Sequence, residues 1–345
     1  MSARVVLVTG VSRFLAGQLA ARLSDDHSIE RVIGVDVVAP EVELGRTEFV
    51  RADIRNPIIG KVITSARVDT VAHMNVIATP YGAGGRTAMK EINVIGTMQL
   101  LAACQKAATV QKLVVKSTTA VYGSSARDPV LFTENMEPRS LPRSGYAKDA
   151  VEVEGYVRGL GRRRPDIDVT LLRFANFIGP LIDTPLTRYF SLPVVPTVLG
   201  FDPRVQFVHE RDGLEILHEA VVGNHRGTFN AAGDGVVLLS QAIRRAGRTS
   251  LPLPTPALSL ASSLFRRTGL VDFSPEQVPF LQFGRGVDTT RLRTDFGFTP
   301  TYSTLDAFDD FVTSRAFARI LDPTRAFAAQ GWVRTRVARG SVAGA

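Results

Sequence analysis

The sequence predicts an α/β protein built on one doubly wound parallel sheet, with a small interleaved lobe contributed by its second half. Two observations support this prediction. Short, continuously apolar runs alternate with longer helical patterns, and prolines become frequent after Pro180. Continuously apolar strands separated by helices are typical of a parallel sheet that is covered on both faces. Such sheets bind ligands at the carboxyl ends of their strands.

Six runs rich in β-branched residues have the length of strands. They are RVVLVTG at 4–10, RVIGVD at 31–36, TEFVRAD at 47–53, VDTVAHM at 68–74, KLVVKST at 112–118 and IDVTLLRFAN at 167–176. Between them, apolar residues recur at helical spacing in 13–23, 88–107 and 145–161. We therefore expect regular strand–helix alternation over residues 1–175, with VQFVHE and GTFNAAG as later strands.

Composition excludes several classes of protein. The single cysteine rules out a disulfide framework, and the five histidines do not fall at metal-ligand spacing, so we expect no metal. No run of 18 apolar residues and no secretory signal pattern occurs, which favours a cytoplasmic protein without a transmembrane segment. The formal net charge is +8, but Phe311 to the end carries six arginines and one acid, a local +5. We expect no nucleic-acid partner, because this arginine preference more often reflects coding bias.

A turn that can hold a phosphate follows the first predicted strand. It reads Gly10-Val11-Ser12-Arg13-Phe14-Leu15-Ala16, so only the first glycine of a G-x-x-G-x-x-G spacing is present. Glycines in such a turn let the backbone approach a pyrophosphate at a helix N-terminus. Arg13 adds bulk there, although its guanidinium can itself pair with a phosphate. A plain strand–turn–helix without a ligand is the alternative interpretation.

Two acids end neighbouring strands of the same predicted sheet. Asp36 ends the second strand, where a carboxylate accepts from the ribose hydroxyls of a dinucleotide and repels a 2′-phosphate. Asp53 ends the third strand, where it can accept from the adenine amino group. This pair predicts NAD as the cofactor, in preference to NADP.

A set of ordered motifs extends over residues 4–312. It comprises TGVSRFLAG, RADIRNP, DTVAH, INVIGTMQLLAAC, KSTTAVYG, AKDAVEVE, LLRFANFIGP, RVQFVHERD, GTFNAAG and DTTRLRTDFGFTP. In this order they resemble the extended short-chain dehydrogenase/reductases, in particular the NAD-dependent epimerase/dehydratase family, in a divergent branch similar to UDP-glucose 4-epimerase. The resemblance implies a Rossmann domain with cofactor contacts at Gly10, Arg13, Phe14, Leu15, Asp36, Asp53, Ile54, Met74, Asn93 and Lys148.

The resemblance also implies the catalytic residues. In the family a Ser/Thr orients the substrate oxygen, a tyrosine moves the proton and a lysine lowers the tyrosine pKa. The matching positions here are Thr118 and Lys148, and the tyrosine position, four residues before the lysine, is Ser144. A serine hydroxyl is a poorer acid or base than a phenol. Tyr146 lies about 200° around the helix from Lys148, so we expect it not to substitute for the missing phenol.

The substrate side follows from the same resemblance. Asn176 and Arg204 match positions that contact a nucleotide-sugar diphosphate. Dehydration is not expected, because Thr119-Ala120 replaces the acid pair of the dehydratases. We therefore predict an NAD-binding, epimerase-like oxidoreductase that acts on a nucleotide sugar or a related alcohol by transient hydride transfer. The alternative is a catalytically impaired NAD-binding regulatory or scaffold protein of the same fold.

The expected organisation divides the chain into three parts. Residues 1–175 form the NAD-binding Rossmann domain, to which 205–232 return, while 176–204 and 233–315 form the substrate lobe. Residues 316–345 are expected to be a basic amphipathic tail that packs on the protein or contacts an anionic membrane surface. The resemblance further implies a homodimer formed through the helices around 86–107 and 145–161.

Overall fold

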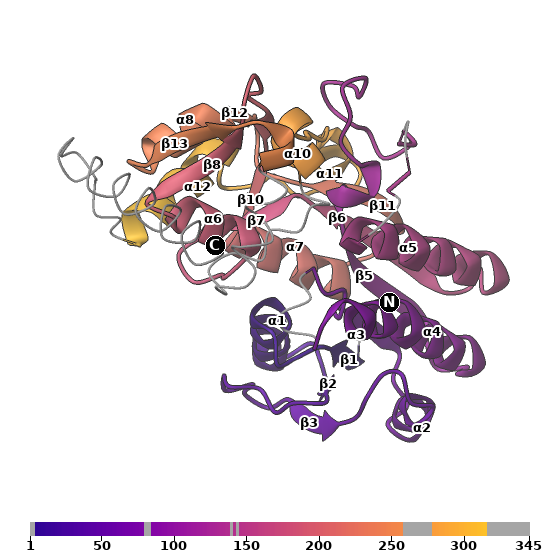
Figure 1. Ribbon diagram of the computed structural model, residues 1–345. Helices are drawn as coiled ribbons and strands as arrows, with labels where there is room; N and C mark the ends of the chain where they lie inside the picture. Colours follow the sequence, from indigo (N-terminus) through magenta and orange to yellow (C-terminus); the bar gives the residue numbers. More distant parts are fainter. Residues whose placement is uncertain (1–3, 79–83, 139–140, 143–144, 258–277, 316–345) are drawn as a thin grey trace, which may run out of the picture.

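The computed structural model describes residues 4–78, 84–138, 141–142, 145–257 and 278–315 (Figure 1). Its main sheet has seven parallel strands in the order β11-β6-β5-β4-β1-β2-β3. The predicted fold class is therefore confirmed. The strands are β1 (Val5–Thr9), β2 (Arg31–Asp36), β3 (Glu48–Arg51), β4 (Thr70–His73), β5 (Lys112–Thr118), β6 (Asp168–Phe174) and β11 (Gly227–Ala231).

Helices cover both faces of this sheet (Figure 1). On one face, α1 (Phe14–Asp25) and α7 (Glu210–Val222) pack against each other and share a core with Val6, Val8 and Val114. On the other face lie α2 (Ile58–Ser65), α4 (Thr97–Lys106) and α5 (Gly145–Arg163), which bury Leu7, Leu113 and Val115. Alternate residues of each strand therefore belong to different cores, as the pleat requires.

The helical pattern predicted over 88–107 contains an irregularity. It begins as α3 (Arg86–Lys90), widens into the π-helix η2 (Glu91–Gly96) and continues as α4. Gly96 lies where the helix crosses Ile54, and a Cβ there would lie 2.7 Å from the Ile54 side chain. A π-helical turn of this kind is frequent near functional sites.

The second half of the chain builds a lobe with a separate core. Short two-stranded pairs form it, and Phe190, Phe207 and Phe308 pack edge-to-face or stacked in its interior. The remaining elements are η3 (Thr119–Tyr122), β7 (Asn176–Ile178), α6 (Pro185–Ser191), β8 (Val194–Val198), β9 (Arg204–Val205), β10 (Phe207–His209), β12 (Val237–Leu238), α8 (Leu239–Arg245), β13 (Thr249–Leu253), α10 (Val278–Phe283), α11 (Thr290–Thr294) and α12 (Thr304–Ser314).

The described elements also bear on the membrane and metal predictions. Among the described residues, no helix is long and apolar enough to cross a membrane. The same residues contain no group of three or more His, Cys, Asp or Glu side chains that could hold a metal ion. The tail at 316–345, with its predicted surface role, lies outside the described residues.

Candidate active site and cofactor crevice

The turn after β1 has the geometry of a phosphate-binding turn at its first glycine. Gly10 has φ +78°, in the left-handed region, and a Cβ at this position would lie 3.1 Å from Asn75 Oδ1. Glycine alone adopts this conformation without strain. Helix α1 starts four residues later with Arg13 as its N-cap, and no side chain caps it. Its first N–H groups and the positive end of its dipole are therefore available to an anion.

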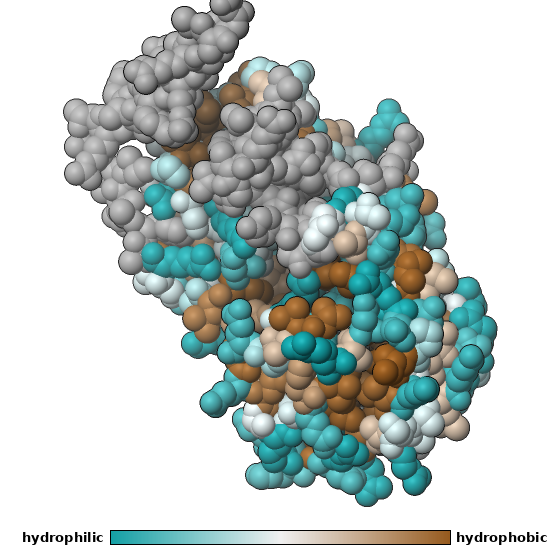
Figure 2. All heavy atoms as spheres, turned by 60° about the horizontal axis from the view of Figure 1, so that its bottom comes forward, coloured by the Kyte–Doolittle hydropathy of each residue, from teal (hydrophilic) through white to brown (hydrophobic). Residues whose placement is uncertain are grey.

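Asp36 holds this turn from the end of β2. Its carboxylate accepts hydrogen bonds from the Ser12 backbone N–H at 3.0 Å, the Ser12 hydroxyl at 2.6 Å and the Val37 N–H at 2.7 Å. Val37 and Val38, which follow Asp36, are exposed apolar residues. Figure 2, which brings the bottom of Figure 1 forward, shows apolar residues gathered among hydrophilic ones on this side of the molecule.

The other predicted cofactor residues surround the carboxyl ends of β3 and β4. Asp53 is paired with Arg55 at 2.6 Å, and this hydrogen bond lowers the pKa of its carboxyl group. Ile54 and Met74 are buried apolar side chains. Asn93 is fully buried, and its amide exchanges hydrogen bonds with the backbone of Ile77 at 2.7 and 2.9 Å. Asn93 thus connects η2 to the segment after β4, and its amide hydrogen bonds are made to protein groups.

Thr118 and Tyr146 meet at the carboxyl end of β5. Thr118 Oγ1 accepts from the Ala120 N–H at 3.2 Å and thereby caps η3, and the Tyr146 phenol lies beside the Thr118 side chain. Burial raises the pKa of Tyr146 to about 12, against the opposing effects of the neighbouring Thr118 hydroxyl and the Arg285 guanidinium. That Tyr146 does not substitute for the missing phenol stays a prediction, but its phenol is the one that lies beside Thr118.

The phase of α5 explains this placement of Tyr146. Ala150, Val153 and Val157 form the buried stripe of α5, and Tyr146, which packs against the same core as Val153 and Val157, continues this stripe one turn earlier. Lys148 is about 200° away from Tyr146, so only one of the two can face Thr118. Its side chain is 45% exposed, and its ammonium lies 3.9 Å from Glu152 Oε1. Ser144 lies outside the described residues.

A buried ionic network supports the end of β5 from below. Glu154, 2% exposed, receives hydrogen bonds from Arg173 Nη2 at 2.7 Å and from the Ser117 hydroxyl at 2.6 Å. Arg173 also donates to the Tyr122 phenol oxygen at 2.7 Å, and Tyr122 stacks on Phe132 with ring centroids 4.6 Å apart. The network links α5, β5 and β6, so it fixes the backbone that carries Thr118.

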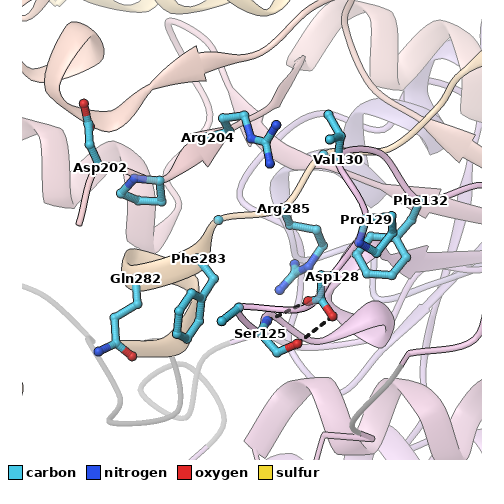
Figure 3. A pocket seen from close by; sticks show the side chains of 14 residues that line it. Ser125, Asp128, Pro129, Val130, Phe132, Asp202, Arg204, Gln282, Phe283 and Arg285 are labelled. Atoms are coloured by element: carbon cyan, nitrogen blue, oxygen red, sulfur yellow. Dashed lines mark hydrogen bonds between the residues drawn. The ribbon is translucent and has the colours of Figure 1, made fainter. Parts of the chain in front are cut away.

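A polar pocket of about 220 Å³ lies between the loop after η3 and the lobe (Figure 3). Arg204 from β9 and Arg285 from the segment after α10 both line it. Arg285 Nε donates to the Gly123 carbonyl at 2.7 Å and Nη2 to the Ser124 hydroxyl at 3.1 Å. Burial lowers the pKa of Arg285 to about 10, although the Asp128 carboxylate opposes this change.

The acids of this pocket are already occupied by protein groups. Asp128 accepts from the Ser125 N–H and hydroxyl at 2.6 and 2.7 Å, and Asp202 accepts from the Ser240 N–H and hydroxyl at 2.8 and 2.7 Å. The backbones of Arg204 and Arg285 are adjacent at this pocket, because the Arg285 N–H donates to the Arg204 carbonyl at 3.1 Å. Two arginines and two aspartates thus line the pocket, and the aspartate oxygens are occupied by the neutral donors of Ser125 and Ser240. Asn176 begins β7, at the base of the lobe.

Comparison with known proteins agrees with this geometry. Residues 6–230 match the model of the NAD dependent epimerase/dehydratase family. The chain belongs to this family. An uncharacterized protein of Mycobacterium tuberculosis is 50% identical over 326 residues, which cover 93% of this chain and 87% of that protein. A probable UDP-arabinose 4-epimerase of Oryza sativa is 25% identical over 189 residues, 50% of this chain and 45% of that protein.

Solved structures of the family share the fold. UDP-glucose 4-epimerase of Thermotoga maritima, solved with UDP-glucose, aligns with a TM-score of 0.68 at 20% identity, over 90% of this chain and 98% of that one. UDP-glucuronic acid 4-epimerase of Bacillus cereus, solved with UDP-glucuronic acid and NAD, aligns with a TM-score of 0.69 at 20% identity and the same coverage. Gly10, the uncapped α1 and Asp36 fit the dinucleotide that the family name specifies.

Proposed function

We propose that this epimerase/dehydratase family member is an NAD-dependent epimerase that acts on a nucleotide sugar. The observation that carries the proposal is the placement of the Tyr146 phenol beside the Thr118 hydroxyl at the carboxyl end of β5. A hydroxyl that orients and a phenol that moves a proton are the two groups that oxidation of a sugar alcohol requires. We propose NAD in preference to NADP, because the Asp36 carboxylate would repel a 2′-phosphate.

The proposed division of labour uses groups of this chain. NAD, when bound, supplies the hydride chemistry. The Thr118 hydroxyl holds the reacting sugar oxygen, and the Tyr146 phenolate accepts the proton of that hydroxyl and later returns it. The Glu154–Arg173 network keeps Thr118 and Tyr146 in register from beneath. Dehydration is not proposed, because the residues after Thr118 are Thr119 and Ala120 and neither is an acid.

The pocket supports a phosphorylated substrate. We propose that Arg204 and Arg285 bind the diphosphate of the sugar nucleotide, since arginine pairs with phosphate oxygens through two parallel hydrogen bonds. Asn176 is proposed to contact the same nucleotide from β7. Because Arg285 also bonds to Gly123, directly after η3, the pocket adjoins the Thr118–Tyr146 pair. The sugar of a bound nucleotide would therefore extend from the arginines toward Tyr146.

One feature supports the alternative, an NAD-binding protein with impaired chemistry. With Tyr146 as the phenol, the position one helical turn later, where the family has its lysine, is Ala150, which is 1% exposed. No ammonium then lowers the pKa of the phenol from that position. A protein in this condition would bind its ligands and turn them over slowly or not at all.

The two functions are separated by incubating the purified protein with NAD and a panel of UDP-sugars, and following the C4 configuration by NMR. We expect the appearance of an epimer for at least one sugar. A protein that binds NAD and UDP but interconverts no sugar in the panel would support the impaired alternative. Arg204→Gln is expected to weaken UDP binding about tenfold or more and to leave NAD binding unchanged.

A further inference from the structure

Lys116, on β5, is a charged residue that the proposed chemistry does not use. Thr9 of β1 pairs with His73 of β4, and His73 pairs with Val115 of β5, so Lys116 is one residue closer to the carboxyl edge. Neighbouring strands are about 4.8 Å apart, which puts β5 about 10 Å from β1. Lys116 thus enters the crevice close to the turn that follows Gly10.

The side chain of Lys116 lies on the face of the sheet that α1 and α7 cover. Val114, two residues earlier on the same face of β5, shares a core with Leu15 of α1 and Leu217 of α7. Lys116 is only partly exposed, and burial together with the Arg13 charge lowers the pKa of its ammonium to about 8. The same ammonium, with burial, helps to lower the pKa of His73. Since β5 is about 10 Å from β1 and Lys116 lies on the face that α1 covers, the charges of Lys116 and Arg13 share the same crevice and repel each other.

In the described part of the chain, neither of these two cations makes a direct ion pair. No ion pair or side-chain hydrogen bond joins Lys116 or Arg13 to a described carboxylate. Asp36 attracts Arg13 electrostatically, but its oxygens accept from Ser12 and Val37. Two partly buried cations that lie close together destabilise a fold, and an anion placed between them offsets this penalty. The uncapped start of α1 adds a third positive feature.

We infer that Lys116 and Arg13 together bind the diphosphate of the dinucleotide, so that side-chain cations replace the close backbone approach that the missing glycines would have allowed. This inference rests on the dinucleotide-binding part of the proposed function. Lys116 is a binding residue and takes no part in proton transfer. The same chemistry would bind a free pyrophosphate, so the source of the anion is distinguished by experiment.

The test is calorimetric titration of the ligand-free protein and of Lys116→Met, which keeps the length of the side chain and removes its charge. The titrants are NAD, ADP, adenosine and inorganic pyrophosphate. We expect Lys116→Met to weaken NAD and ADP binding about tenfold to a hundredfold and to leave adenosine binding unchanged. Lys116→Arg should retain most of the affinity. Lys61→Met, on the exposed side of α2, is the matched control and should bind like the wild type.

Thermal unfolding shows whether the variant folds. Since Lys116→Met removes an unpaired, partly buried charge, the ligand-free variant should melt at or above the wild-type Tm, while its Tm gain on adding NAD should shrink. Equal NAD and ADP affinities for the wild type and a folded Lys116→Met would overturn the inference. So would a wild type that binds none of the phosphorylated titrants, or one that binds pyrophosphate alone. If ADP and NAD bind in a way that depends on Lys116 but no sugar is turned over, only the proposed epimerase activity is refuted.

Discussion

The Tyr146 phenol lies beside the Thr118 side chain at the carboxyl end of β5, whereas Lys148, two residues along the same helix, is turned toward Glu152 and solvent. Tyr146 is therefore the described side chain of α5 that adjoins Thr118. This placement makes Tyr146 the candidate proton-transfer residue and gives the family's lysine position to Ala150, on the buried stripe.

Replacing Tyr146 by phenylalanine should abolish most of the activity. The variant loses only a hydroxyl from a side chain that packs on the sheet, so its fold should persist, whereas loss of general acid–base catalysis lowers kcat about 100- to 10,000-fold. Steady-state kinetics on the best UDP-sugar measure this. Tyr156→Phe, exposed on the same helix, is the matched control. A large loss in Lys148→Ala and a small one in Tyr146→Phe would restore Lys148 as the catalytic residue.

The pH profile should report the same phenol. The pKa of Tyr146 is about 12 in the ligand-free protein, so at neutral pH only a small fraction is phenolate. If the phenolate is the base, log(kcat/KM) should rise by about one for each pH unit between pH 7 and pH 10. The residual activity of Tyr146→Phe should lack this slope. A maximum near neutral pH in the wild type would show that another group takes the proton.

The parts of the site that follow apolar runs could be predicted from the sequence. Asp36 and Thr118 end strands whose β-branched composition is plain, and parallel strands gather such residues at one edge. Tyr146 was considered and set aside because the Lys148–Glu152 spacing matched the family pattern. The correcting signal was present: Ala150, Val153 and Val157 define a buried stripe that includes position 146 and excludes 148.

Arg285 lies beyond the reach of such arguments. It is 162 residues from Gly123, whose carbonyl it binds, and no periodicity connects the segment after α10 to the end of η3. Only tertiary packing brings these two segments together. A Cβ on Gly284 would collide with the Arg204 backbone, so the glycine allows the segment after α10 to contact β9. Lys116 is inside a strand that the sequence predicts. The residues near its side chain, however, depend on the order of the strands, which the sequence does not reveal.

Breaking the buried network below the site should cost stability. Glu154→Gln leaves the Arg173 guanidinium buried without its charge partner, and removal of one member of such a pair typically costs about 3–5 kcal/mol. Urea denaturation monitored by circular dichroism measures the change. Glu152→Gln, which alters the exposed pair with Lys148, should change the free energy of unfolding by less than about 1 kcal/mol. Equal losses in the two variants would contradict a special role for the network.

His73 should make the fold sensitive to mild acid. It is fully buried, with Nδ1 at 3.0 Å from the Thr9 hydroxyl and Nε2 at 2.8 Å from the Thr97 hydroxyl. Because Thr97 donates to the Asn93 carbonyl and Thr9 accepts from the Met74 N–H, the network fits a neutral ring that donates from Nε2 and accepts at Nδ1. Burial, aided by the Lys116 charge, lowers the pKa of His73 from 6.5 to about 4.

The unfolded chain therefore binds more protons than the folded one between pH 6.5 and pH 4, so stability falls as the pH falls through this window. The loss reaches about 3 kcal/mol at pH 4. His73→Gln removes the titrating group. Urea denaturation at pH 7 and at pH 4.5 gives the free energy of unfolding of the wild type and of His73→Gln. The difference between the two proteins should shrink at pH 4.5, because only the wild type is destabilised by protonation of residue 73. A difference that stays constant across these pH values would mean that His73 titrates near its ordinary pKa in the folded protein, with Thr9 no longer donating to its ring.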